Sequence, residues 1–158
     1  MKKALILLFA VVISGAALYS QQGQSVDVTE LLRSDLRTQK LAVVTVNMAL
    51  TDAQGELFWP IYRKYEAELV TLNDQVVALI KDYAQNLDKI TDAKADAMTK
   101  QVFAIHGARL KLQEKYYNEF AKALGAALAA KYMQIERQLT AAVDLQIASQ
   151  IPLIKKAS

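Results

Sequence analysis

Apolar residues recur at alternating steps of four and three along most of this chain, which is the spacing that places them on one face of an α-helix. Charged residues fall between these positions, so the pattern predicts long helices with one buried face and one solvated face. The clearest run is Phe58, Tyr62, Tyr65, Leu69, Leu72, Val76, Leu79 and Tyr83.

The start of this long helix is marked by Leu50, Thr51 and Gln54. Thr-x-x-Gln is the capping-box pattern, in which the Thr hydroxyl accepts from the amide three residues on and the Gln side chain reaches back. Pro60 follows within the helix, where it removes an amide donor and crowds the preceding turn. The sequence therefore predicts a kinked second helix. The alternative is a separate short helix, with Pro60 in the first turn of the next one.

A first helix is predicted over residues 28–47. Residues 41–46 (LAVVTV) are β-branched enough to suggest a strand. Leu41, Val44 and Met48 keep helical spacing, however, and no partner strand is available, so a helix is preferred.

The second half of the chain predicts two more helices. Residues 86–90 resemble a turn, and a third helix runs over 92–124 with two apolar stripes, wide enough for two neighbours. One stripe is Met98, Val102, Ile105, Leu112 and Tyr116, and the other is Phe103, Leu110, Tyr117 and Leu124. Gly125 predicts a break, and Pro152 ends a fourth helix.

These elements predict an all-α fold, an elongated antiparallel bundle of four helices with a kinked second helix. Short connections force neighbouring helices to lie antiparallel. The helical domain covers residues 28–153, and 154–158 form a tail. Long, thin helical hairpins leave apolar surface uncovered, so a homodimer is expected.

The N-terminus predicts export. Lys2 and Lys3 precede an uncharged apolar stretch ending in small residues, the pattern of a secretory signal peptide over residues 1–20. Cleavage after Ala17 or Ser20 would leave 21–27 as a flexible mature N-terminus and no membrane anchor; the alternative is an uncleaved anchor. The chain has no Cys, which excludes disulfides and a lipid anchor on cysteine. We expect the mature protein in the periplasm of a Gram-negative bacterium.

Charge argues against a nucleic-acid partner. The chain has 19 basic and 16 acidic residues, and removal of Lys2 and Lys3 leaves 17 against 16, a net charge of +1. These charges are interleaved along the chain, whereas nucleic-acid binders concentrate basic residues on one surface.

No catalytic, cofactor or metal site is predicted, and the chain is not expected to be an enzyme. His106 is the only histidine, and a lone His on a long helix is most often a surface residue. Zinc and copper sites need several His or Cys at short spacing. Glu-x-x-His pairs, which mark di-iron bundles, are missing.

The aromatic cluster that follows the cap allows two interpretations. Phe58, Tyr62 and Tyr65 lie on the helix seam and would form a core stripe. Alternatively, with Trp59, they form an exposed surface that binds other proteins, for which Tyr and Trp are suited. Trp59 lies one position off the seam, beside Pro60, and is the strongest candidate for binding.

Three motifs in this order resemble the exported LTxxQ, or Spy/CpxP-like, periplasmic family, in particular a subgroup with FWPxY and QIE…IPL motifs. They are Leu50-Thr51-x-x-Gln54, the segment Phe58-Trp59-Pro60-Ile61-Tyr62, and Gln134-Ile135-Glu136 followed by Ile151-Pro152-Leu153. The similarity covers roughly residues 31–153. A second LTxxQ copy would fall at Leu124, where this chain has LGAAL.

The resemblance implies a Spy-like, cradle-shaped dimer that holds unfolding envelope proteins without ATP during envelope stress. Its partners would be unfolded envelope proteins. The alternative is an envelope interaction module with one specific partner and no general chaperone activity.

Overall fold

The structure is a computed structural model that describes residues 38–154. The chain divides into residues 1–39 and 40–158, and the account below concerns the second unit. The predicted signal peptide (1–20), the flexible segment (21–27) and the start of the first helix lie outside the described residues. Within the described part every regular element is helical and none is a strand, which confirms the all-α class.

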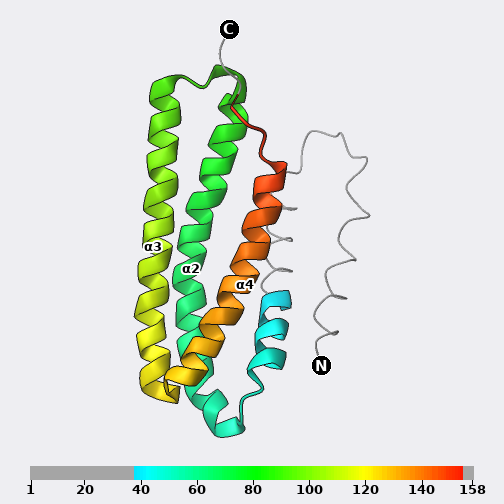
Figure 1. The fold of residues 1–158 in the computed structure, drawn as a ribbon, viewed down its shortest axis with the longest axis vertical. Coiled ribbons are helices and arrows are strands. Elements are labelled where there is room, and N and C mark those ends of the chain that lie inside the picture. The colour runs from blue at the N-terminus through cyan, green and yellow to red at the C-terminus, as the bar shows by residue number, and fades with distance from the viewer. Residues whose placement is uncertain (1–37, 155–158) are drawn as a thin grey trace, which may run out of the picture. The chain divides into compact units, whose positions relative to one another are not determined.

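A helical segment over residues 38–48 comes first, so residues 41–46 are helix as preferred above. It is followed by α2 (Asp52–Asn86), the short 3-10 helix η1 (Leu87–Lys89), α3 (Asp92–Leu124) and α4 (Ala126–Gln150). Figure 1 shows α2 and α3 side by side, with α4 crossing α2.

The capping box at the start of α2 is confirmed. Gln54 N donates to Thr51 Oγ1 at 3.3 Å, and Thr51 N donates to Gln54 Oε1 at 3.0 Å. Leu50, just before the cap, packs against the core. α2 is one helix through Pro60, so Pro60 does not begin a separate helix.

The connection from α2 to α3 is short. η1 occupies the predicted turn, and Thr91 caps α3 by accepting from Lys94 N at 3.3 Å. The Lys94 ammonium donates to the Asp82 carboxylate at 2.6 Å, and this bond fixes the start of α3 to the end of α2.

Gly125 alone joins α3 to α4. Its φ of 87° and ψ of 154° lie in a region that side chains essentially exclude, which is why glycine stands there. Its amide donates to Ala121 O at 3.0 Å, and its carbonyl accepts from Ala129 N at 3.2 Å. One residue therefore ends one helix and starts the next.

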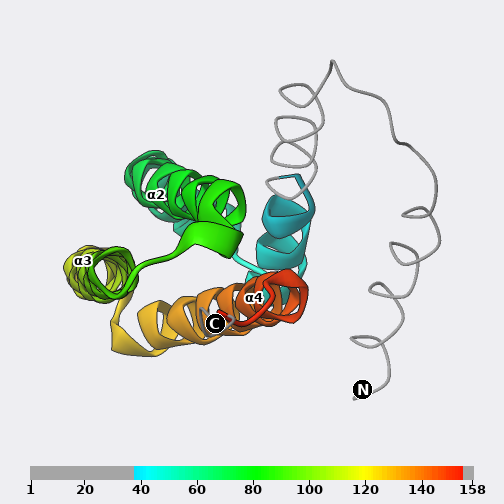
Figure 2. The same ribbon diagram turned by 90° about the horizontal axis from the view of Figure 1, so that it is seen from above.

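The main core lies where α2, α3, α4 and the 38–48 segment meet (Figure 2). The seam predicted for α2 is confirmed, since its first four positions are buried, Leu72 packs against them, and its last three positions lie in or against a second cluster. A smaller cluster of Leu79, Met98 and Ile105 joins α2 to α3 farther along. The buried members of the main core are Val44, Met48, Phe58, Tyr62, Tyr65, Leu69, Leu112, Tyr116, Phe120, Ala129, Tyr132 and Ile135.

The second stripe predicted for α3 is only partly correct. Tyr117 and Leu124 pack against the core, but Phe103 and Leu110 are 68% and 57% exposed, and Val102 is also exposed. Both views show that α4 leaves α3 at Gly125 and diverges from it, so within residues 38–154 the two helices pack less closely along the middle of α3 (Figures 1 and 2).

No helix within residues 38–154 is both long enough and apolar enough to cross a membrane.

Candidate ligand-binding site

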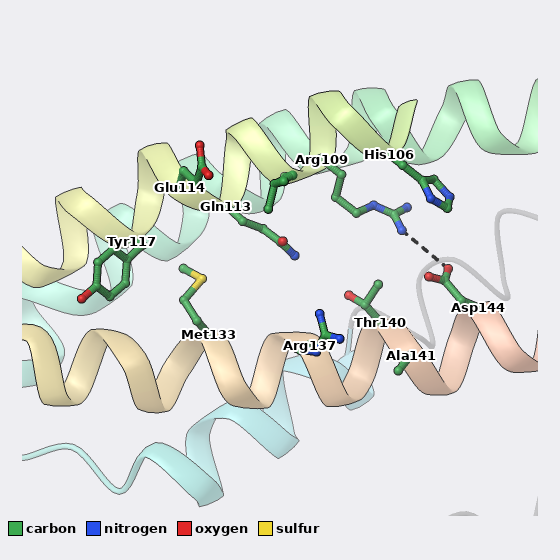
Figure 3. Close-up of a pocket in the computed structure, with 11 residues that line it drawn as sticks. His106, Arg109, Gln113, Glu114, Tyr117, Met133, Arg137, Thr140, Ala141 and Asp144 are labelled. Carbon is green, nitrogen blue, oxygen red and sulfur yellow. Dashed lines mark ion pairs between the residues drawn. The ribbon is translucent and has the colours of Figure 1, made fainter. Parts of the chain in front are cut away.

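A groove with a volume of about 580 Å³ lies between α3 and α4, within the range of about 300–1,000 Å³ typical of small-molecule sites. Figure 3 shows side chains from both helices pointing into it. The lining residues are His106, Arg109, Leu110, Gln113, Glu114 and Tyr117 from α3, and Met133, Arg137, Thr140, Ala141 and Asp144 from α4.

One end of the groove is polar and holds the histidine. The His106 side chain is exposed and lies beside Arg109, one turn along α3 (Figure 3). Arg109 Nη1 pairs with Asp144 Oδ1 at 3.5 Å, and its Nη2 donates to Asn73 Oδ1 at 3.1 Å. Arg109 Nε is buried without a hydrogen-bond partner in the described part of the chain. This end therefore combines an accessible imidazole with a guanidinium whose Nη groups bind Asp144 and Asn73.

The other end of the groove is less polar. Tyr117 and Met133 face each other there and are both partly buried against the main core. Arg137 lies between the two ends, is exposed, and adds a second guanidinium. A flat ligand with an apolar body and anionic groups would find both kinds of contact in this groove.

A second polar cluster is buried beneath the 38–48 segment. Lys40 Nζ lies 2.6 Å from Glu66 Oε1 and 2.7 Å from Glu136 Oε2. The Glu136 side chain is 1% exposed, and its Oε1 accepts from the Tyr65 hydroxyl at 3.0 Å. The cluster joins the first helical segment, α2 and α4, and its charges are held by one another.

The phenols around this cluster stay neutral. Burial, and then the nearby Glu136 carboxylate, raises the pKa of Tyr65 well above its usual range. The pKa of Tyr132 is raised by the same two causes, and its hydroxyl has no hydrogen-bond partner in the described part. The carboxylates of Glu66 and Glu136 share Lys40, and Tyr65 and Tyr132 are part of the main core, so this cluster contributes to packing.

The residues proposed for protein binding lie mostly inside this core. Phe58, Tyr62 and Tyr65 are buried, as the core interpretation requires. Trp59 is half-buried; its ring meets Phe58 edge-on at a centroid distance of 4.9 Å and Tyr62 at 5.5 Å. It also covers Gly55, where an added Cβ would come within 3.4 Å of Trp59 Nε1.

The remaining motif residues have structural contacts or lie on the surface. Gln134 is exposed, while Glu136 is the buried carboxylate described above. The Pro152 carbonyl accepts from the Tyr83 hydroxyl at 2.6 Å, which ties the end of the described chain to α2.

Sequence reasoning missed the groove. It treated His106 as an isolated surface residue, although Arg109, Gln113 and Tyr117 follow it at steps of three to four on one helix face. No group of three or more His, Cys, Asp or Glu side chains could hold a metal ion within residues 38–154.

Comparison with known proteins corrects the family assignment. The family model described as Globin matches residues 63–151, more than half of the chain, from the second quarter of α2 through α4. That segment contains the whole groove and the Gln134-Ile135-Glu136 motif, and it leaves out the LTxxQ and FWPxY motifs, two of the three motifs on which the Spy/CpxP-like resemblance was based. The capping box and the buried aromatic stripe are general features of packed helices, and for this reason they pointed to the wrong family.

The functional predictions that came with that family are corrected with it. The match overturns both the holdase-type chaperone and the envelope interaction module. No curated protein and no solved structure matches the chain significantly. On the extent of the family-model match, the chain belongs to the globin family.

Proposed function

We propose that the groove between α3 and α4 binds haem, and that His106 would hold its iron. The observation that carries this proposal is that the chain's only histidine lines the groove, inside the segment that matches the globin family. In globins the haem iron is held by a histidine nitrogen.

The groove contains a side chain that can bind the iron of haem. An imidazole is the donor that haem iron takes in globins, and His106 is exposed, so its ring is accessible. Met133, whose thioether can also bind haem iron, lies at the opposite end of the groove from His106 (Figure 3). His106 alone is therefore assigned to the iron.

The basic residues of the groove fit the carboxylate groups of haem. Arg guanidinium groups bind carboxylates through paired hydrogen bonds. Arg109 has a buried Nε without a partner in the described part of the chain, and Arg137 is exposed beside it across the groove. Arg137 would orient the ligand by binding a propionate, and Arg109, which is held by Asp144 and Asn73, would add positive charge nearby.

The apolar residues of the groove would cover the haem macrocycle only in part. Leu110, Tyr117 and Met133 offer apolar surface, but Leu110 is 57% exposed and Glu114 beside it is also exposed. The groove is therefore open at its Leu110 edge. We expect binding that is weaker than in an enclosed pocket, because less of the ligand is removed from water.

When bound, haem would supply an iron centre able to bind oxygen or transfer an electron. The protein's own part is binding and orientation, and the proposal includes no catalytic step by its side chains.

We also infer that α2, α3 and α4 form an antiparallel bundle and that α2 bends at Pro60. Two contacts support the antiparallel order of α2 and α3: Lys115–Glu68 at 2.7 Å and Arg109–Asn73 at 3.1 Å. The residue with the higher number in α3 contacts the residue with the lower number in α2, as antiparallel helices require. The bend at Pro60 is supported by the missing amide donor of proline.

We also propose that the protein is exported, on the basis of its basic start and apolar stretch. A mass measured for the protein recovered from the periplasm would test this. A mass that matches the uncleaved chain, found in the cytoplasm, would contradict it.

The test of haem binding is titration of the purified chain with hemin, followed by its Soret absorption. We expect saturation at one hemin per chain and a spectrum typical of histidine ligation. His106→Ala should abolish that spectrum, and Arg137→Ala should weaken binding about tenfold, as expected for loss of a charged hydrogen bond.

Lys111→Ala is the matched control, because Lys111 is an exposed basic residue of α3 that does not line the groove. It should bind hemin like the wild type. A Soret spectrum that is the same in the wild type, His106→Ala and Lys111→Ala would mean adventitious hemin association and would overturn the proposal.

A further inference from the structure

The chain's only tryptophan stands at one end of a series of tyrosines that runs through the main core. The ring centroids of Trp59 and Tyr62 are 5.5 Å apart, and those of Tyr62 and Tyr132 are 6.0 Å apart. Tyr132 is followed by Tyr65 at 6.1 Å and then by Tyr116 at 5.3 Å. Interacting aromatic pairs have centroids about 4.5–7 Å apart, so these five residues form one continuous ring series across α2, α4 and α3.

Packing alone does not explain why the core members of the ring series carry hydroxyl groups. Phe58 and Phe120 lie in the same core, so phenylalanine packs there equally well. The Tyr132 hydroxyl is buried without a hydrogen-bond partner in the described part of the chain, and such a group destabilises a fold. What tyrosine offers and phenylalanine does not is a ring that gives up an electron readily. The hydroxyls therefore indicate a chemical role for the ring series.

Two of these hydroxyls donate to carboxylates. The Tyr116 hydroxyl donates to Glu68 Oε1 at 2.7 Å, and the Tyr65 hydroxyl donates to Glu136 Oε1 at 3.0 Å. Burial, and then the hydrogen bond to Glu68, raises the pKa of Tyr116 well above its ordinary range, so the phenol is neutral. A neutral phenol loses an electron far more easily when its proton can move to a base at the same time. Both carboxylates are placed to serve as that base.

Glu68 is the better proton acceptor of the two. The Glu136 side chain is 1% exposed, and the buried end of Lys40 holds its carboxylate at 2.7 Å, so a proton could not pass on to water. The Glu68 side chain is 47% exposed, and its partner Lys115 is exposed as well. Water therefore reaches Glu68 and can take up the proton. Tyr116 is the residue of the ring series at which an oxidation would end.

We propose that the ring series carries an electron from Tyr116 to Trp59 when Trp59 has been oxidised. A one-electron oxidant takes an electron from the half-buried Trp59, whose N–H proton leaves to water, and a neutral indolyl radical remains. The Tyr116 phenol then loses one electron, which passes along the ring series, and one proton, which passes to Glu68. Trp59 takes up that electron and a proton from water. The products are an intact Trp59 and a phenoxyl radical at Tyr116.

Pulse radiolysis of the full chain without haem tests this transfer. Azide radicals oxidise tryptophan in preference to tyrosine, and the chain offers them a single tryptophan. We expect the absorption of the indolyl radical to decay while that of the phenoxyl radical grows. The rate of this exchange should not depend on protein concentration, because both residues belong to one molecule. A rate proportional to protein concentration would mean transfer between molecules and would overturn the proposal.

Conservative variants identify the residues that take part. Tyr116→Phe keeps the ring and removes the hydroxyl, and it should abolish the fast growth of the phenoxyl radical. Glu68→Gln removes the proton acceptor and should slow that growth about tenfold, as expected for loss of a charged hydrogen bond. Tyr132→Phe should also slow it, because a ring that is much harder to oxidise then lies in the middle of the ring series.

Tyr83→Phe is the matched control, because Tyr83 lies outside the ring series and its hydroxyl donates to the Pro152 carbonyl. It should behave like the wild type. Equal rates in Tyr116→Phe and Tyr83→Phe would overturn the proposal, provided that circular dichroism shows both variants folded. If Tyr116→Phe does not fold, equal rates in Glu68→Gln and the wild type would overturn it instead. No haem enters these measurements, so a failure of hemin binding would leave the electron transfer standing.

Discussion

The Lys40 ammonium lies 2.7 Å from the Glu136 carboxylate, although the two residues are 96 positions apart in the sequence. Lys40 also lies 2.6 Å from Glu66, so one cation holds two carboxylates from different helices. The side chain of Glu136 is 1% exposed, whereas those of Lys40 and Glu66 are 16% and 19% exposed. This cluster attaches the first helical segment to the bundle.

Removal of the cation should therefore destabilise the fold strongly. Lys40→Met leaves the buried carboxylate of Glu136 without a counter-charge, which costs about 3–5 kcal/mol when a buried pair is broken. Chemical denaturation should show this loss in the free energy of unfolding at neutral pH.

Lys100→Met is the matched control, because Lys100 forms an exposed pair with Asp96. Its effect should stay below about 1 kcal/mol, the usual limit for a surface pair. Equal effects of the two substitutions would show that the Lys40 cluster does not hold the segment.

Trp59 should contribute to stability through its ring contacts. Trp59→Ala removes edge contacts with Phe58 and Tyr62 and exposes the backbone around Gly55, so we expect a loss of about 2–3 kcal/mol. Thermal or chemical unfolding measures this value.

Phe58 is fully buried, so Phe58→Ala should lower the free energy of unfolding by about 3–5 kcal/mol, more than Trp59→Ala. Leu57→Ala, at an exposed neighbouring position, should change the stability by less than about 0.5 kcal/mol. A Trp59→Ala variant as stable as Leu57→Ala would mean that the ring is free for another role.

Glu68 should give the fold a measurable dependence on acid pH. A hydrogen bond from Lys115, and then one from Tyr116, lowers the pKa of the Glu68 carboxyl below its ordinary value. A lowered pKa in the folded state means that the stabilisation is fully present above the unfolded-state pKa, about 4.3, and is lost as the pH falls through the lowered value.

The melting temperature of the wild type should therefore fall more steeply than that of Glu68→Gln between about pH 5 and about pH 2. At neutral pH the wild type should be the more stable of the two. Parallel curves across this range would show that the ion pair with Lys115 does not persist in solution.

Most of the fold followed from local patterns. The capping box at Thr51, the turn after Asn86 and the break at Gly125 are each encoded within a few residues, and all three occur where the sequence predicts them. The seam from Phe58 to Leu79 was also correct, because one helix face must be buried somewhere. The exposure of Phe103 was not predictable, since it depends on the direction that α4 takes after Gly125.

The candidate site could not be predicted from sequence patterns, because it also depends on how the helices are arranged. His106 acquires neighbours only when α3 and α4 bring Arg109, Arg137 and Asp144 around one groove. Glu136 was noted only as part of a motif, although it lies one turn after the buried Tyr132 on the same helix face. A carboxylate at that position on an apolar stripe was a signal that it would be buried with a cation.

The junction at Gly125 has a consequence for ligand entry. Because one residue joins α3 and α4, the two helices cannot separate at that end without breaking the bonds to Ala121 and Ala129. The His106 end lies about 28 Å farther along α3, as estimated from 19 residues at the helical rise of about 1.5 Å per residue. A small rotation about Gly125 thus moves the distant end by several times as much as the near one, so a single glycine can set how wide a molecule the groove admits.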